Sequence, residues 1–301
     1  MDKSRVVLVR KKDKTALSEL EQVAPLQTMV EQGLLELTGS SDVASAWSKY
    51  FQPADTIGVK VNCIGGRNMC THPQLAEAAA RSLGAIRIVP KQIVIWERSI
   101  RELNKCGYLL NWDNPQRFQC LATDTKGVDY ERDLAVFGSI GSRFSRILTT
   151  LVSAQINMPV LKDHGLCGLT AALKNTFGAI HNPNKYHDDH CDPFIADVNA
   201  VPLVRKKNRL VICDALRVQY NGGPAFKAQW TEDLGGILLA EDPVALDVVG
   251  VMLVDRIRRK YGMAPIEKDG GLPGYLKTAG DREHGLGRCE WDAIEFRETF
   301  V

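Results

Sequence analysis

Short apolar runs rich in β-branched residues alternate along this chain with stretches of helical spacing. The clearest runs cover residues 56–62, 93–97 and 209–214, and they end at Asn62, Glu97 and Asp214. Apolar residues at helical spacing fill the intervals between these runs. Strands that alternate with helices form parallel sheets whose faces the helices cover. The pattern predicts a doubly wound α/β fold, with a mostly parallel sheet and helices on both faces.

The stretch over residues 110–145 is polar and less periodic than the rest. It fits either an inserted hairpin or the meeting place of two lobes. A chain of 301 residues is long enough for one large α/β domain or for two lobes. We therefore expect a single domain over 1–301, with any division into lobes near 110–150.

The charge pattern argues against a nucleic-acid partner. The net charge is +2, and the basic residues are not gathered in one segment. No apolar run approaches the length of a membrane span, and the first residues do not form a signal peptide. As written, the sequence predicts a cytoplasmic protein without a membrane span, and homo-oligomerisation is only the default expectation.

One window collects most of the reactive side chains. Four of the six histidines, three lysines and two cysteines lie between Lys162 and Cys191. A merely structural loop has no reason to gather so many groups that bind metals or transfer protons. The local pattern predicts a strand closed by Pro159, a glycine-rich loop, and a helix over 169–180.

The expected sheet places several of these residues at one edge. Ligands of open α/β sheets bind beyond the carboxyl ends of the strands. Lys60 and Lys162 each end an expected strand, so they either bind one carboxylate or phosphate together or are solvated. Thr170 and Lys174 would share one face of the helix, whose N-terminus would favour an anion.

Asn62 and Asn175 are further candidates at this edge. Their amides either donate hydrogen bonds to a substrate oxygen or satisfy loop backbone. His164 follows a strand end and precedes glycines, so its imidazole is expected to be accessible and to transfer protons. Lys174 is either an ordinary helix lysine or a buried one whose lowered pKa suits a base or a covalent anchor.

The segment from His187 to Cys191 is dense in nitrogen, oxygen and sulfur donors. His187 and His190 with the intervening acids would suit zinc, nickel or iron, and His181 could join them. The alternative is a hydrated polar loop.

The eight cysteines are dispersed and contain no Cys-x-x-Cys pair, so most read as reduced and buried. Four of them lie near the expected cleft and are the candidates for a thiolate cluster: Cys63, Cys70, Cys167 and Cys191.

Several motifs occur in an order that resembles the domain-of-unknown-function 362 family. The motifs are 57–62 with Gly65-Gly66 and Thr71-His72-Pro73, then 156–164, 168–175, 195–197 and 242–247. The family is largely uncharacterised. Its members are often called iron–sulfur centre proteins because many carry a ferredoxin-like segment, and many carry a twin-arginine export signal. The sequence as written shows neither feature, so export stays open only if a signal has been removed.

A more distant resemblance is to lactate racemase, which carries a nickel-pincer nucleotide on a lysine. His164, Lys174 and His190 have the spacing of the racemase's catalytic histidine, cofactor-bearing lysine and nickel ligand. The resemblance thus implies a metal or a lysine-attached pincer cofactor. The glycines before the racemase lysine are replaced here by Ala171-Ala172, and its Asp-x-Thr-Arg-Pro motif has no clear match.

The leading hypothesis is an enzyme for a small anionic substrate. In it Lys60 and Lys162 hold the anion, His164 transfers a proton or assists hydride movement, and His190 binds a metal or organometallic cofactor near Lys174. The reaction would be redox or racemase-like. The alternative is a metal- or iron–sulfur-binding accessory protein that carries electrons to a redox partner, and a third possibility is a scaffold with a vestigial site.

Overall fold

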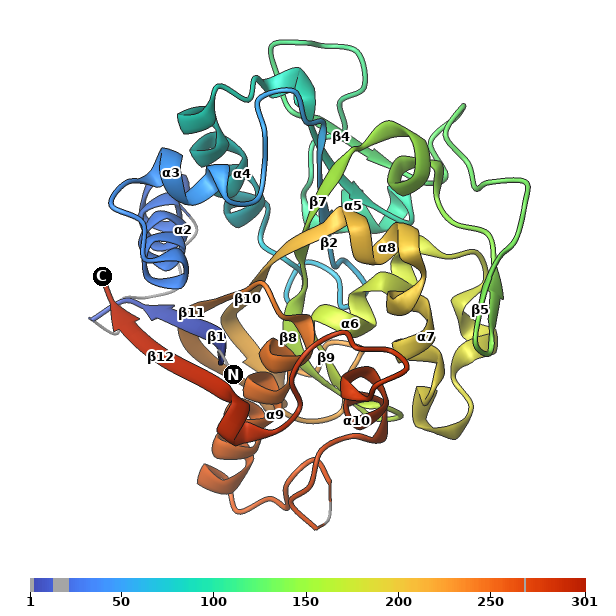
Figure 1. Cartoon of the computed structure of the whole chain (residues 1–301). Coiled ribbons are helices and arrows are strands. Elements are labelled where there is room, and N and C mark those ends of the chain that lie inside the picture. Colours follow the sequence, from blue (N-terminus) through green and yellow to red (C-terminus); the bar gives the residue numbers. More distant parts are fainter. Residues whose placement is uncertain (1–2, 13–21, 268) are drawn as a thin grey trace.

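The computed structural model describes residues 3–12, 22–267 and 269–301. Its centre is one large sheet (Figure 1). Eight strands follow one another across this sheet. In spatial order they are β12 (Ile294–Phe300), β1 (Ser4–Arg10), β11 (Thr231–Ala240), β10 (Asn208–Gln219), β7 (Ala154–Met158), β2 (Ile57–Val61), β3 (Ile93–Glu97) and β4 (Gln119–Ala122).

Most neighbouring strands are parallel. The run from β10 through β7, β2 and β3 to β4 is parallel throughout, and β12 is parallel to β1. Only β11 runs against its two neighbours on this path, β1 and β10. The predicted mixed α/β class with a mostly parallel sheet is confirmed.

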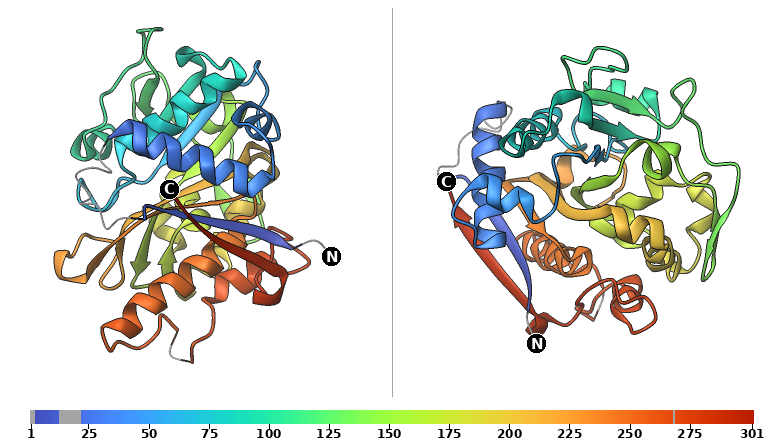
Figure 2. Two further views of the ribbon diagram at one scale, coloured as in Figure 1. Left: turned by 90° about the vertical axis from the view of Figure 1, so that its left-hand side faces the viewer. Right: turned by 45° about the horizontal axis from the view of Figure 1, so that its top comes forward.

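Helices cover both faces of the sheet, as the apolar strands require (Figure 2). Alternate residues of β1 join different cores: Val7 and Val9 pack on one face, and Val6 and Leu8 on the other. The first face carries α2 (Val23–Thr38), α3 (Val43–Ser48), α4 (Pro73–Ser82) and α5 (Ile100–Cys106). The second carries α7 (Phe194–Ala200), α8 (Pro202–Lys207), α9 (Pro243–Lys260) and α10 (Gly274–Gly280).

The central window differs from its expected local structure. The chain continues past Pro159 into a further strand, β8 (Val160–His164), which pairs with β10 and with the short β9 (Gly168–Thr170). The helix expected over 169–180 is wrong over its first turn, because Thr170 pairs with Lys162 across the β8–β9 hairpin. Helical structure is confined to α6 (Ala172–Asn175) and one 3₁₀ turn over Thr176–Ala179.

The polar stretch over 110–145 contains β4 and a two-stranded antiparallel hairpin, β5 (Ala135–Phe137) and β6 (Ile140–Ser142). An inserted hairpin was one of the two expectations for this stretch. The spacing of apolar residues predicts a first helix over about 15–37; residues 13–21 lie outside the described residues, and α2 begins at Val23.

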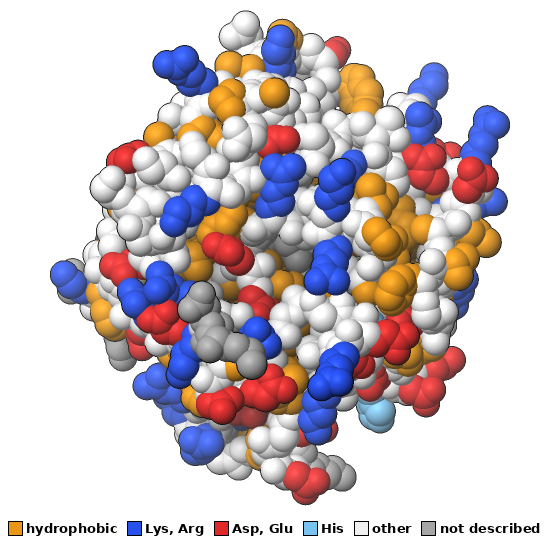
Figure 3. Space-filling view, viewed as in Figure 1, with side chains coloured by type: hydrophobic (Ala, Val, Ile, Leu, Met, Phe, Trp, Pro, Cys, Tyr) orange, Lys and Arg blue, Asp and Glu red, His pale blue; other side chains and the backbone are white. Residues whose placement is uncertain are grey.

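The face shown in Figure 3 carries acidic and basic side chains side by side rather than one sign of charge. Within the described ranges, no helix is both long and apolar enough to cross a membrane.

A buried histidine fastens the C-terminal part of the chain to α7. His284 Nε2 lies 2.9 Å from an Asp197 carboxylate oxygen, and its Nδ1 lies 3.0 Å from Asp281. Burial by itself would lower the pKa of His284, but the hydrogen bonds to Asp197 and Asp281 outweigh burial, and the pKa is raised above its usual 6.5. The charged imidazolium therefore links two carboxylates.

This link should make stability depend on pH. The folded pKa of His284 exceeds the unfolded value, so the stabilisation is fully present below pH 6.5 and is lost as the pH rises through the folded pKa. We expect His284→Gln to cost about 1.5–3 kcal/mol at pH 5.5 and less at pH 9, because hydrogen bonds to charged groups contribute that much. Urea unfolding of the wild type and the variant at the two pH values measures this loss in the free energy of unfolding. An equal loss at pH 5.5 and pH 9 would contradict a charged His284.

Candidate functional site

A pocket of about 230 Å³ lies where β2, β3 and β8 lead into their loops. Side chains from four separate chain segments meet in it. Seven of the residues that sequence reasoning singled out line the pocket: Asn62, Lys162, His164, Thr170, Lys174, Asn175 and His187. The carboxyl edge of the parallel strands is thus where these groups come together.

Lys162 is held in the pocket wall by a chain of asparagines. Its side-chain nitrogen donates to Asn62 Oδ1 at 3.2 Å, and Asn62 Nδ2 donates to Asn175 Oδ1 at 3.2 Å. Asn175 Nδ2 in turn donates to Asn157 Oδ1 at 2.8 Å. The amide groups of Asn62 and Asn175 are therefore occupied with one another and with Lys162, which favours a positioning role over direct substrate binding.

Two groups in this pocket retain unused hydrogen-bonding capacity. The Lys162 side chain is 0% exposed, and its ammonium has one hydrogen-bond partner among the described residues although it carries three donors. The Thr170 hydroxyl is buried and has no partner among the same residues. Buried polar groups are nearly always satisfied, so these two point to a ligand or to water. Burial lowers the pKa of Lys162 to about 8.

The contacts of His164 fix its tautomer. Its Nδ1 accepts hydrogen bonds from the backbone N–H groups of Leu166 at 3.3 Å and Cys167 at 3.4 Å. Burial, followed by the nearby charge of Lys174 and by His187, lowers the pKa of His164 to about 3. The ring is neutral at physiological pH and carries its proton on Nε2. It can donate a hydrogen bond, but it is a poor base.

Lys174 and His187 form a second pair. The Lys174 nitrogen lies 3.2 Å from His187 Nε2 and 3.7 Å from the centre of the Phe177 ring. His187 Nδ1 lies 3.1 Å from the carbonyl oxygen of Pro183 and must donate to it, which leaves Nε2 as the acceptor for Lys174. Burial lowers the pKa of Lys174, and burial together with Lys174 lowers the pKa of His187. The pair can share and pass on a proton.

The start of α6 is not an anion site. Both oxygens of Asp247, from α9, accept from the first backbone N–H groups of α6, at 2.7 Å from Ala172 and 3.1 Å from Leu173. The expectation that this N-terminus receives a substrate anion is therefore wrong, because a carboxylate of the chain already occupies it. Asp247 instead fixes the turn that carries Lys174.

Lys60 also differs from expectation. Its ammonium lies 2.8 Å from Glu97 Oε1 and 2.6 Å from the carbonyl oxygen of Val61, and both charged side chains are 2% exposed. Gly178 covers the pair so closely that a Cβ there would lie 2.6 Å from the Lys60 nitrogen. Glu97 lines the pocket but Lys60 does not. The charge of Lys60 is compensated by Glu97 and is not available to a substrate.

The histidines proposed as metal ligands do not gather. His190 is exposed and its Nδ1 faces the carbonyl oxygen of Leu166 at 2.8 Å, while His181 packs edge-on against Tyr130. Only His187 lines the pocket. In the part of the chain that the structure describes, no group of three or more His, Cys, Asp or Glu residues could hold a metal ion.

These residues also do not fit a lysine-bound pincer nucleotide in this arrangement. Lys174 is paired with His187, not with His190, which lies outside the pocket lining. The cavity of about 230 Å³ beside Lys174 leaves room next to this lysine for a small group only.

The four candidate cluster cysteines separate into two places. Cys63 and Cys70 lie with Cys106, whose sulfur is 3.5 Å from the carbonyl oxygen of Cys63. Cys167 and Cys191 lie against one another. All five are buried free thiols. A single cluster held by Cys63, Cys70, Cys167 and Cys191 is therefore not formed.

Sequence reasoning missed several pocket residues. Glu97 is the last residue of β3, as Lys60 lies near the end of β2. The expectation that ligands bind at the carboxyl ends of strands therefore applies to Glu97 as well as to Lys60. Arg98 and Glu102 follow directly on the same segment and line the pocket. Asp247 lies 75 residues from its partner Ala172, and no local pattern reveals that contact.

The fold and the pocket define a mixed α/β protein with a small pocket at the carboxyl edge of its parallel strands. Comparison with protein-family models matches residues 57–252 to the family described as Domain of unknown function (DUF362). The match covers more than half of the chain, so the chain belongs to this family, as its motifs indicated.

A search of curated proteins finds no match. Among solved structures, a crystal structure of a Thermotoga maritima protein from a structural genomics consortium is similar, with a TM-score of 0.43 and 11% sequence identity. The similarity covers 74% of this chain and 58% of that protein, so the chain spans less than two thirds of its length. A likeness at this level carries no argument about function.

The buried Lys60–Glu97 pair can be tested by removing one partner. Lys60→Met leaves the Glu97 carboxylate buried without its counter-ion, which should reduce the free energy of unfolding by about 3–5 kcal/mol. Arg81→Met breaks the exposed Arg81–Glu77 pair and should cost less than about 1 kcal/mol. Urea unfolding compares the two variants. Lys60→Met with Glu97→Gln should recover part of the loss, and equal costs for both single variants would refute the buried pair.

Proposed function

We propose that this protein is an enzyme that binds a small carboxylate in the pocket and transfers a proton at the carbon next to it, in a racemase-like or isomerising reaction. The observation that carries the proposal is the meeting, in one small pocket, of an under-bonded buried ammonium, Lys162, with a lysine–histidine pair, Lys174 and His187.

The support for an anionic substrate is the charge of Lys162. A buried ammonium that uses one of its three donors within the described part of the chain is costly unless a partner compensates it, and a carboxylate supplies charge and acceptors together. The unpartnered Thr170 hydroxyl in the same wall offers a further donor. His164 adds a neutral Nε2–H that can donate to a substrate oxygen.

The support for proton transfer is the state of Lys174. Because burial lowers its pKa, its neutral amine is easier to reach than that of an exposed lysine. In the proposed step the amine takes a proton from the substrate C–H bond. The electron pair of that bond passes into the carboxylate, whose growing negative charge Lys162 stabilises. The proton is shared with His187 and then returned to carbon.

Proton transfer at carbon can be detected without knowing the product. In D₂O, the wild-type protein should replace the α-hydrogen of a 2-hydroxy acid by deuterium, with lactate, glycerate and malate as the probes and proton NMR as the measurement. Lys174→Met should slow the exchange at least about 100-fold, since general bases contribute that much. Lys206→Met, which removes an exposed lysine elsewhere, is the control and should exchange like the wild type. Equal exchange by Lys174→Met and Lys206→Met would refute the role of Lys174.

Anion binding should weaken above pH 8. Lys162 has a folded pKa of about 8, so its ammonium is present below that value and is lost as the pH rises through it. Calorimetric titration with glycerate should give a constant affinity up to pH 7 and a fall of about tenfold per pH unit above pH 9. Lys162→Met should bind more weakly and lose most of this pH dependence. Wild-type affinity that stays constant to pH 10 would contradict the assignment.

A further inference from the structure

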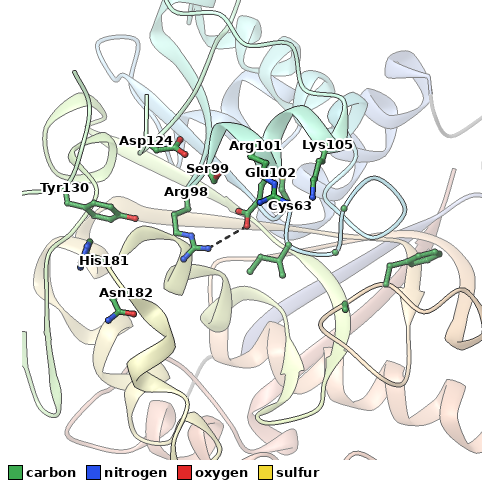
Figure 4. A pocket seen from close by; sticks show the side chains of 15 residues that line it. Cys63, Arg98, Ser99, Arg101, Glu102, Lys105, Asp124, Tyr130, His181 and Asn182 are labelled. Atoms are coloured by element: carbon green, nitrogen blue, oxygen red, sulfur yellow. Dashed lines mark ion pairs between the residues drawn. The ribbon is translucent and has the colours of Figure 1, made fainter. Parts of the chain in front are cut away.

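A second, larger cavity adjoins the pocket. Its volume is about 970 Å³, and we call it the outer basin. Ile64, Arg98 and Glu102 line both cavities, so the basin begins where the inner pocket ends. Figure 4 shows the basin residues that α5 and its approach contribute, with Arg98, Arg101, Glu102 and Lys105 grouped together.

The basin carries more available positive than negative charge. Arg101 and Lys105 are exposed, lie four residues apart on α5, and have no ion-pair partner within the described part of the chain. Arg98 has only a loose contact to Glu102, at 3.7 Å. On the acidic side, Asp124 already accepts the Ile100 backbone N–H at 2.7 Å.

Glu102 marks the boundary between the two cavities. One of its carboxylate oxygens is buried and has no hydrogen-bond partner among the described residues. Burial, followed by the neighbouring charge of Glu97, raises the pKa of Glu102. The carboxyl group of Glu102 contacts Arg98 alone among the cations of the basin, so Arg101 and Lys105 stay uncompensated within the described residues.

We propose that the outer basin is a subsite for a phosphate monoester group carried by the same molecule whose carboxylate lies in the inner pocket. This inference rests on the proposed function and narrows its substrate class to small phosphorylated carboxylic acids. A phosphate monoester carries close to two negative charges and three acceptor oxygens. It therefore matches the guanidinium groups of Arg98 and Arg101 and the ammonium of Lys105 better than a single carboxylate does. Arg98 lines both cavities, so it can contact either the carboxylate or the phosphate of such a molecule.

Two probes that differ only in the phosphate test the subsite. Glycerate and glycerate 3-phosphate share the carboxylate and the hydroxyl group, and calorimetry gives both dissociation constants. We expect the wild type to bind the phosphorylated probe at least tenfold more tightly. Arg101→Met with Lys105→Met should abolish this preference and leave glycerate affinity unchanged. The matched control, Lys206→Met with Arg282→Met, removes the same charge from exposed positions outside both cavities and should keep the preference.

The outcomes separate the two proposals. Equal affinity of the wild type for both probes, or a preference that survives in the Arg101→Met, Lys105→Met variant, overturns the phosphate subsite alone. Malate that binds as tightly as glycerate 3-phosphate overturns the choice of phosphate over a second carboxylate. Unchanged glycerate binding by Lys162→Met overturns the inner-pocket proposal, whatever the preference for phosphate.

Discussion

The burial of the Lys162 ammonium is the constraint around which the site is arranged. An ammonium without solvent contact is expensive, and within the described residues a single hydrogen bond, which it donates to Asn62 Oδ1, compensates it directly. That bond is oriented by Asn175 and Asn157, which come from α6 and β7. The parallel sheet matters here because it brings the ends of β2, β7 and β8 to one edge, where Asn62, Asn157 and Lys162 meet Asn175 of α6.

The order of the pocket depends on contacts that bridge long stretches of sequence. Asp247 of α9 holds the first turn of α6, and that turn places Lys174 against His187. Asp247 is fully buried, and burial raises its pKa to about 7. It therefore acts on the site only through Lys174, as a positioning residue.

Much of this arrangement follows from the sequence, and the part that does not has physical causes. The strands that lead to Asn62 and Glu97 could be predicted because the periodicity of apolar residues is a local property. Since ligands of open α/β sheets bind beyond the carboxyl ends of the strands, Lys162, His164 and Lys174 could then be placed together. The predicted helix over 169–180 is wrong over its first turn because Thr170 pairs with Lys162 in a β-hairpin. Such strand pairing is a tertiary effect that the local spacing of apolar residues does not encode. The histidine spacing likewise did not predict which histidine faces Lys174. A left-handed backbone at His190 turns that residue outward, and His187 takes the place.

The Lys60–Glu97 pair explains why one of the two expected anion-binding lysines is not available. Glu97 ends its strand in the pocket wall, where an unpaired carboxylate would repel an anionic substrate. Lys60 neutralises it from behind, and the backbone N–H of Arg98 donates to its second oxygen. The lysine thus contributes to anion binding indirectly. By cancelling the negative charge of the wall, Lys60 leaves the Lys162 ammonium as the charge that a substrate meets, and in a small pocket of low dielectric that difference decides the sign of the field.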